Sequence, residues 1–136
     1  MLILLPPSET KRDGGATGSR LDLDALSFPS LTRARRAAIA GLRAISKSVA
    51  TSRKALGLGP TQRFEIDRNR AIGTSATMSA IERYTGVLYD AIDVASLDGS
   101  ARDFLGRHVV IHSALFGLVR AEDPVPQGER SIARSP

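Results

Sequence analysis

Two short apolar runs, far apart in the chain, constrain the fold more than any other feature of the sequence. Residues 1–5 are continuously apolar and are followed by Pro6 and Pro7, and residues 109–111 are the β-branched run Val-Val-Ile. Both patterns are typical of β-strands. Because residues 1–5 show no polar alternation, we expect this strand to be buried in a sheet that is covered on both faces. Helical patterns lie between the two strands, so their order predicts an α+β (mixed α/β) layer structure with a small sheet and flanking helices.

The longest helical pattern predicts a helix from residue 33 to about Leu56. Its apolar residues recur at spacings of four, three and four, which is the period of one helix face: Ala38, Leu42, Ile45 and Val49. We expect a break or kink at residues 50–52. Beyond Leu56, hydrophobic residues alternate with Gly57 and Gly59, and a second helix is expected at residues 61–72. Residues 33–72 therefore predict a helix-hairpin-helix-like element.

Basic residues gather in the same segment. The chain has a net charge of +5, and residues 25–64 contain eight basic residues and no acidic residue. Four of the basic residues recur at spacings of seven, four and seven on a second helix face: Arg36, Arg43, Lys47 and Lys54. Such a segment favours a polyanionic partner, because each phosphate that a protein neutralises releases condensed counterions. A solvated helix face, followed by a Gly-rich turn without a ligand, is the alternative interpretation.

Polar residues follow both predicted strands. Ser8, Glu9, Thr10 and Lys11 come after the first strand, and Ser113 comes after the second. Groups past the strand ends of an open α/β sheet often form an active site, so these residues predict a pocket. Turn and capping chemistry is the alternative interpretation. Ser113 lacks the Gly-x-Ser-x-Gly surroundings of a hydrolase nucleophile.

The sequence offers little for metal, redox or membrane chemistry. It has no Cys, which excludes disulfides, thiolate-bound zinc and a Cys nucleophile. His108 and His112 flank the run at 109–111, and a strand rise of roughly 3.3 Å per residue places them about 13 Å apart, too far to chelate one ion. Residues 1–5 are too short for a signal peptide or a membrane span. We therefore expect no metal, no cofactor and no membrane partner, and a binding protein rather than an enzyme.

Three segments resemble, in order, the motifs of the YaaA-like peroxide-stress resistance family. They are residues 1–11, the Tyr84-Thr85-Gly86 motif, and residues 113–123, and the resemblance runs from residue 1 to about residue 126. It implies a cytoplasmic protein of the oxidative-stress response that limits damage from peroxide and free iron. It also implies DNA binding through a helix-hairpin-helix element, with residues 56–60 as the hairpin. Together with the basic face and the turn glycines, this gives the expected DNA-binding set: Arg36, Arg43, Lys47, Arg53, Lys54, Gly57, Gly59, Arg63, Arg68 and Arg70.

The chain also departs from this family. Members run to about twice this length, whereas residues 127–136 form a polar stretch without apolar periodicity. We therefore expect a truncated domain at 1–126 and a disordered or aberrant tail at 127–136. Strands that pair with the absent half would expose apolar edges, and Phe116, Leu118 and Val119 would lack partners. This surface predicts self-association.

Two further interpretations stay open beside DNA binding. One is an enzyme or a protein that binds a small anionic ligand, with Lys11 and Arg120 holding the anion and Glu9 acting as acid or base. Its pocket would combine both strand-end clusters with the central motif: Ser8, Glu9, Thr10, Lys11, Tyr84, Thr85, Gly86, Ser113, Gly117 and Arg120. The other is a fragment without a function of its own.

Overall fold

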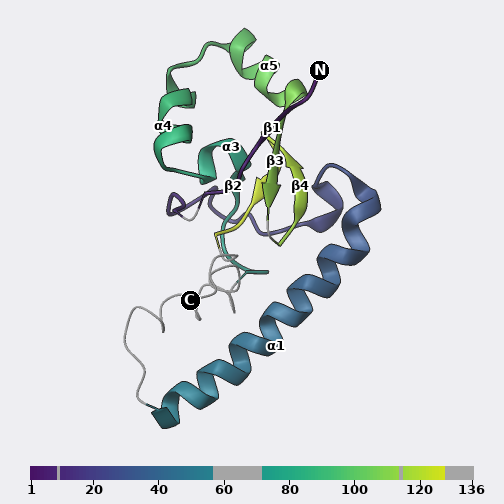
Figure 1. Ribbon diagram of the computed structural model, residues 1–136, viewed down its shortest axis with the longest axis vertical. Helices are drawn as coiled ribbons and strands as arrows, with labels where there is room; N and C mark the ends of the chain where they lie inside the picture. Colours follow the sequence, from purple (N-terminus) through teal and green to yellow (C-terminus); the bar gives the residue numbers. More distant parts are fainter. Residues whose placement is uncertain (9, 57–71, 114, 128–136) are drawn as a thin grey trace.

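A three-stranded mixed sheet joins the two apolar runs. The computed structural model describes residues 1–8, 10–56, 72–113 and 115–127, with the backbone alone at 45–56. Strand β1 (Ile3–Leu5) pairs in parallel with β3 (Val109–Ser113), which continues as an antiparallel hairpin into β4 (Gly117–Arg120), in the order β1-β3-β4 (Figure 1). Both predicted strands are confirmed, and so is the mixed α+β class.

Shorter elements surround this sheet. A second sheet pairs β2 (Met78–Ser79) with β5 (Pro124–Val125) in antiparallel fashion. The remaining helical elements are η1 (Leu23–Ala25), η2 (Pro29–Leu31), α1 (Thr32–Leu56), α3 (Ala80–Arg83), α4 (Val87–Ile92), η3 (Val94–Ser96) and α5 (Gly99–His108). Helix α5 begins where a cap is available, because the carboxylate of Asp98 accepts a hydrogen bond of 2.8 Å from the amide of Ala101.

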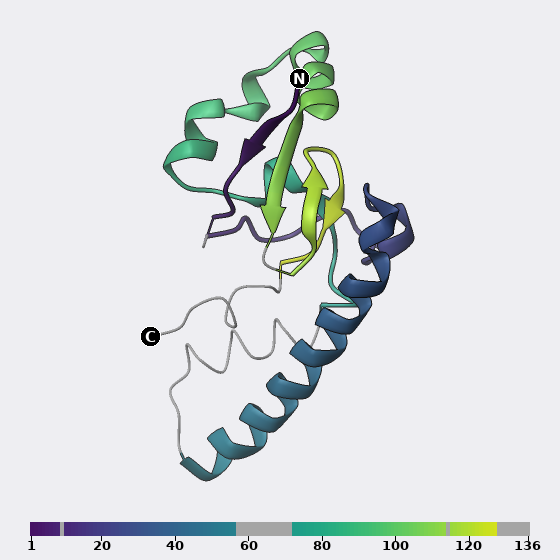
Figure 2. The same cartoon turned by 45° about the vertical axis from the view of Figure 1, so that its right-hand side comes forward.

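Helix α1 is the longest element and projects beyond the sheet. Its 25 residues correspond to about 37 Å at 1.5 Å per residue. Both views show its C-terminal part extending away from the β-strands (Figures 1 and 2). The expected kink at residues 50–52 is wrong: the helix is unbroken to Leu56, since that stretch contains neither the Gly nor the Pro that costs a helix most. The expected turn at 57–60 and nearly all of the second helix lie outside the described residues.

No helix in the described ranges combines the length and the apolarity that a bilayer crossing requires.

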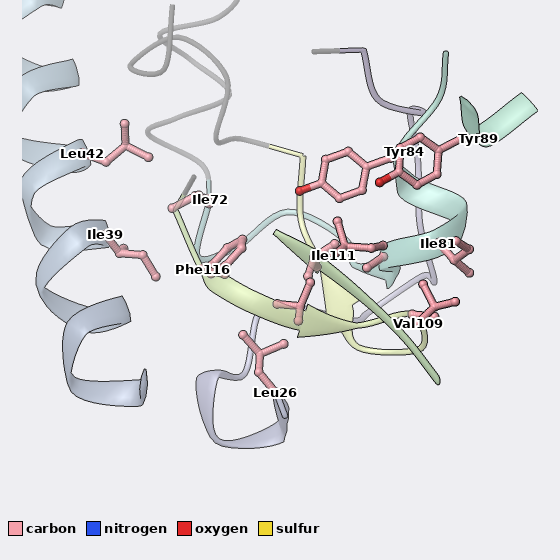
Figure 3. Close-up of a cluster of buried hydrophobic side chains, with 14 residues drawn as sticks. Leu26, Ile39, Leu42, Ile72, Ile81, Tyr84, Tyr89, Val109, Ile111 and Phe116 are labelled. Atoms are coloured by element: carbon pink, nitrogen blue, oxygen red, sulfur yellow. The ribbon is translucent and has the colours of Figure 1, made fainter. Parts of the chain in front are cut away.

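The hydrophobic core extends from α1, past the sheet, to Ile81 in α3 and to Tyr84 and Tyr89 (Figure 3). Ile39 and Leu42 face Phe116 and Ile111, with Leu26 and Ile72 at the edges of the same cluster (Figure 3). Phe116 and Val119 are only 2% and 1% exposed. The expectation that these two side chains lack partners is therefore wrong, because both belong to the buried hydrophobic cluster; Leu118, named with them, is half-buried.

Strand β1 is exposed instead. The side chains of Leu2 and Leu4 are each 63% exposed, and Ile3 is 36% exposed. The expected burial of this strand is wrong: in the described part of the chain β1 is an edge strand that pairs only with β3, and most of its apolar side chains stay exposed. The expectation of an exposed apolar edge thus applies to β1 rather than to the β3–β4 hairpin.

Candidate functional site

The N-terminal half of α1 presents two arginines on one exposed face. Arg36 and Arg43 are seven residues apart, which is two helical turns, or about 10.5 Å along the axis. Arg36 lies 3.4 Å from the carboxylate of Asp24, and both side chains are mostly exposed. An ion pair this exposed contributes only about 0–1 kcal/mol, so a phosphate can replace Asp24 at little cost.

A groove runs between these two arginines. It encloses about 300 Å³ and is lined by Leu21, Leu23, Arg36, Ile39, Ala40, Arg43 and Gly73. None of these lining residues is acidic. The Arg43 guanidinium lies so close to Gly73 that a Cβ atom at position 73 would overlap its Nη2 atom. The groove therefore combines an apolar floor with two cationic walls.

The rest of the expected DNA-binding set is placed only in part. Positions 47, 53 and 54 belong to the helical backbone of α1, and 47 and 54 continue the spacing of Arg36 and Arg43. Gly57, Gly59, Arg63, Arg68 and Arg70 lie outside the described residues. The structure thus brings Arg36 and Arg43 to one groove.

The first strand-end cluster meets the central motif, as the pocket interpretation expects. The hydroxyl of Ser8 donates to the carbonyl of Thr85, and the hydroxyl of Thr10 donates to the same carbonyl at 3.2 Å. The hydroxyl of Thr85 donates to Thr10 Oγ1 at 2.9 Å. The backbone follows the same pairing, because the amide of Thr85 donates to the carbonyl of Thr10 at 3.1 Å. We call Ser8, Thr10 and Thr85 the hydroxyl clamp.

Lys11 and the two tyrosines extend the hydroxyl clamp. Lys11 Nζ lies 5.5 Å from the centre of the Tyr84 ring and donates to the carbonyl of Ser8 at 3.4 Å. The rings of Tyr84 and Tyr89 stack with centroids 5.5 Å apart, and the hydroxyl of Tyr89 donates to the carbonyl of Pro6. These contacts tie the loop after β1 to the segment before α4.

The chemistry of the hydroxyl clamp is that of a structural joint. Its hydroxyls donate to one another and to backbone carbonyls, and within the described residues neither a histidine nor a carboxylate lies within hydrogen-bond distance of them. A serine or threonine needs such a base to become a nucleophile. Glu9, the expected acid or base, lies outside the described residues.

Ser113, Gly117 and Arg120 do not join the hydroxyl clamp. The buried Ser113 hydroxyl accepts the amide of Phe116 at 3.0 Å, which closes the turn between β3 and β4. Gly117 has φ 69° in the same turn. The Arg120 guanidinium donates to the carbonyl of Arg107 at 3.2 Å and lies over the ring of Phe28. The structure therefore brings together Ser8, Thr10 and Thr85 of the expected ten-residue pocket, whereas Arg120 makes its contacts with Arg107 and Phe28.

Gly86→Ala is expected to loosen the hydroxyl clamp and to lower the free energy of unfolding by about 2 kcal/mol. Gly86 has φ 117° and ψ 178°, a backbone conformation open essentially to glycine alone. Space is not the obstacle, since a Cβ there would meet Ser8 Oγ at an ordinary 3.4 Å. Urea denaturation measures the change. Gly99→Ala is the matched control, since a Cβ at Gly99 meets nothing within 4 Å, and an equal loss in both variants would contradict the argument.

Sequence reasoning missed three buried polar residues that hold this framework together. The Arg35 guanidinium donates to four backbone carbonyls, at 2.7–3.3 Å: those of Ser27, Phe28, Phe116 and Leu118. The Arg83 guanidinium donates to three: those of Arg12, Ala76 and Val125. Burial lowers the pKa of both guanidinium groups, and the carboxylates of Asp123 and Asp13, respectively, oppose the shift.

The third missed residue is Asp123, the last residue of the third resembling segment. Its carboxylate accepts the amide and the hydroxyl of Ser27 and the amide of Arg120, at 2.8–3.0 Å. The Arg-x-x-Asp pattern at residues 120–123 is the sequence signal that could have identified Asp123. In the structure these residues form a turn, and the Asp123 carboxylate anchors the segment before α1. Within the described residues, no group of three or more His, Cys, Asp or Glu side chains is placed to hold a metal ion.

Comparison with known proteins places the chain in a family. Residues 1–127 match the family model described as "Peroxide stress protein YaaA". A UPF0246 protein of Corynebacterium glutamicum is 52% identical over 126 residues, covering 93% of this chain and 49% of the relative. A UPF0246 protein of Streptomyces coelicolor is 42% identical over 127 residues, covering 93% and 48%. An uncharacterized protein of Campylobacter jejuni is 28% identical over 127 residues, covering 93% and 51%.

The chain spans about half the length of the curated relatives it matches. The family match covers the same residues that carry the three motifs, the hydroxyl clamp and α1. The resemblance inferred from those motifs is confirmed, and the chain belongs to the YaaA peroxide stress protein family.

Proposed function

We propose that this chain serves peroxide-stress resistance by binding the DNA backbone through the basic face of α1 and the basic segment that follows it. The observation that carries the proposal is the charge pattern of residues 25–64, with eight basic and no acidic residues. Arg36 and Arg43, the two members of that pattern whose exposed side chains line the groove, share one face of a projecting helix.

The chemistry of these groups suits a phosphate backbone. A guanidinium is always charged and matches a phosphate with two parallel hydrogen bonds. Every phosphate that it neutralises releases condensed counterions, so binding is driven by charge and weakens as salt rises. Contacts of this kind position a protein on DNA without reading bases, so we propose binding by backbone and shape rather than by sequence.

The link to peroxide stress rests on family membership. DNA is a target of iron-driven oxidative damage, and we propose that the protein limits this damage in the cytoplasm while bound to DNA. The proposal adds no metal site, since the residues that support it are arginines and lysines.

A salt titration of binding to a short labelled duplex tests the DNA contact. The full 136-residue chain is compared with Arg36→Ala and Arg43→Ala by fluorescence anisotropy. Each substitution is expected to make the slope of log affinity against log salt less negative by about 0.9, because one phosphate contact is lost. Arg53→Ala/Lys54→Ala/Arg63→Ala tests the following segment in the same way.

Arg107→Ala is the control for charge alone. Arg107 is exposed on α5, outside the basic segment, so its loss lowers the net charge by the same amount as the loss of Arg43. We expect its salt dependence to match that of the unsubstituted chain. Equal slopes for Arg43→Ala and Arg107→Ala, or no binding at low salt by a folded chain, would falsify the proposal.

A further inference from the structure

We propose that the groove beside α1 is a subsite for one phosphodiester of the DNA backbone, and that Gly73 positions the Arg43 guanidinium in it. This inference rests on the proposed function and adds to it a defined place and a second residue. Gly73 lies outside residues 25–64, the segment with eight basic and no acidic residues, so the charge pattern does not identify it.

The lining of the groove fits an anion that carries an apolar face. Arg36 and Arg43 form its two cationic walls, and Leu21, Leu23, Ile39 and Ala40 form its floor. A phosphodiester presents the same combination, a charged phosphate next to a deoxyribose ring. A volume of about 300 Å³ is at the small end of ligand sites, so the groove suits one backbone unit rather than the face of a duplex.

A second hollow in the described part of the chain has a different lining. That hollow encloses about 490 Å³ and is lined by Arg102, Asp103, Gly106, Arg107 and Glu122. The charges in this hollow neutralise one another. Arg102 pairs with Glu122, and its Nη2 atom lies 2.7 Å from the carboxylate of Glu82. The hydrogen bond to Glu122 raises the pKa of Arg102 above its usual range. Arg36 in the groove also has a carboxylate partner, Asp24, but that pair is long and mostly exposed, whereas two carboxylates hold Arg102 closely; phosphate therefore has a reason to choose the groove on α1.

Gly73 is required there by space and not by backbone conformation. Its φ lies outside the left-handed range that favours glycine. A Cβ at this position would overlap the tip of the Arg43 side chain, with no other side chain and no backbone atom in the way. Because a guanidinium on a flexible stem moves easily, a side chain at 73 displaces the guanidinium and leaves the backbone in place. A glycine at 73 thus holds open the position that Arg43 occupies.

The test compares three variants of the full chain in the duplex titration: Gly73→Ala, Arg43→Ala and the double variant. Gly73→Ala and Arg43→Ala are each expected to weaken binding on the order of fivefold at low salt and to reduce the salt slope by about 0.9. The double variant is expected to bind no more weakly than Arg43→Ala, because both changes remove the same contact.

Gly41→Ala is the matched control. Gly41 lies on the same helix, and a Cβ there meets nothing within 4 Å. It is expected to bind DNA as the unsubstituted chain does. Circular dichroism of every variant establishes that the helices are retained.

The outcomes separate this inference from the proposed function. If Arg43→Ala weakens binding and Gly73→Ala behaves like Gly41→Ala, the positioning role is wrong and the proposed function stands. Additive losses in the double variant overturn the positioning role in the same way. If Arg43→Ala binds DNA as tightly as the unsubstituted chain, the subsite and the proposed contact at Arg43 fail together.

Discussion

Arg35→Ala is expected to lower the free energy of unfolding by about 3–5 kcal/mol, a loss at the upper end for a single substitution. The Arg35 side chain is 1% exposed and donates to the carbonyls of Phe116 and Leu118 on the β3–β4 hairpin, and of Ser27 and Phe28 before α1. Truncation removes all four hydrogen bonds, leaves the buried carbonyl of Phe116 and three partly buried carbonyls without this donor, and opens a cavity. Since these bonds dock α1 onto the sheet, α1 should lose its anchor.

Urea denaturation followed by circular dichroism measures the effect of Arg35→Ala. Arg33→Ala is the matched control, because Arg33 is exposed on the first turns of the same helix and its loss should change stability by less than about 0.5 kcal/mol. Arg35→Lys should fall between the two, since a single ammonium cannot reach four carbonyls in different directions. An Arg35→Ala chain as stable as Arg33→Ala would show that the four bonds do not anchor α1.

Arg83→Met is expected to cost about 3 kcal/mol, the second large effect. Arg83 is fully buried and joins three segments that are distant in sequence: its guanidinium donates to Arg12 in the N-terminal loop at 2.6 Å, to Ala76 at 2.9 Å and to Val125 in β5 at 3.2 Å. Methionine keeps most of the volume and removes the donors. The loss therefore reports the unpaired carbonyls rather than a cavity.

Hydrogen exchange locates the effect of Arg83→Met. The amides of Arg12 and Thr85 donate across the pairing between the N-terminal loop and the central motif, and both should exchange faster in the variant. Protection in the β3–β4 hairpin should change less, because Arg83 donates to no carbonyl of that hairpin. Arg107→Ala controls for the loss of one positive charge. Uniformly faster exchange throughout the chain would indicate global destabilisation instead of a local joint.

Local signals account for the parts of the fold that could be predicted. The two apolar runs became β1 and β3, and the apolar spacing of α1 placed Leu42 in the core. Each of these depends on residues within a few positions of one another, where periodicity and capping decide the structure. The absence of a kink at 50–52 follows from the same local rules, since serine and threonine cost a helix far less than proline.

Burial could not be predicted in the same way. Residues 1–5 show the pattern of a covered strand, yet β1 is exposed, while Phe116 and Val119 are buried. Whether a strand is covered depends on which distant elements pack against it, and composition within the strand does not contain that information. The hydroxyl clamp could not be predicted for a related reason: Ser8, Thr10 and Thr85 meet because two segments about 75 residues apart in the sequence pair with each other.

Arg35 and Arg36 show where the sequence by itself stops. The sequence alone determined that residues 25–64 are basic and that α1 is helical, because charge and periodicity are properties of neighbouring residues. It could not distinguish these two adjacent arginines. About 100° of rotation around α1 separates them, and the carbonyls of Phe116 and Leu118, some 80 residues away, accept one and not the other. Only the tertiary structure decided that Arg35 is buried and holds the fold together, because a buried charge is stable only where hydrogen-bond acceptors surround it. Arg36, without such acceptors around it, lies exposed at the groove.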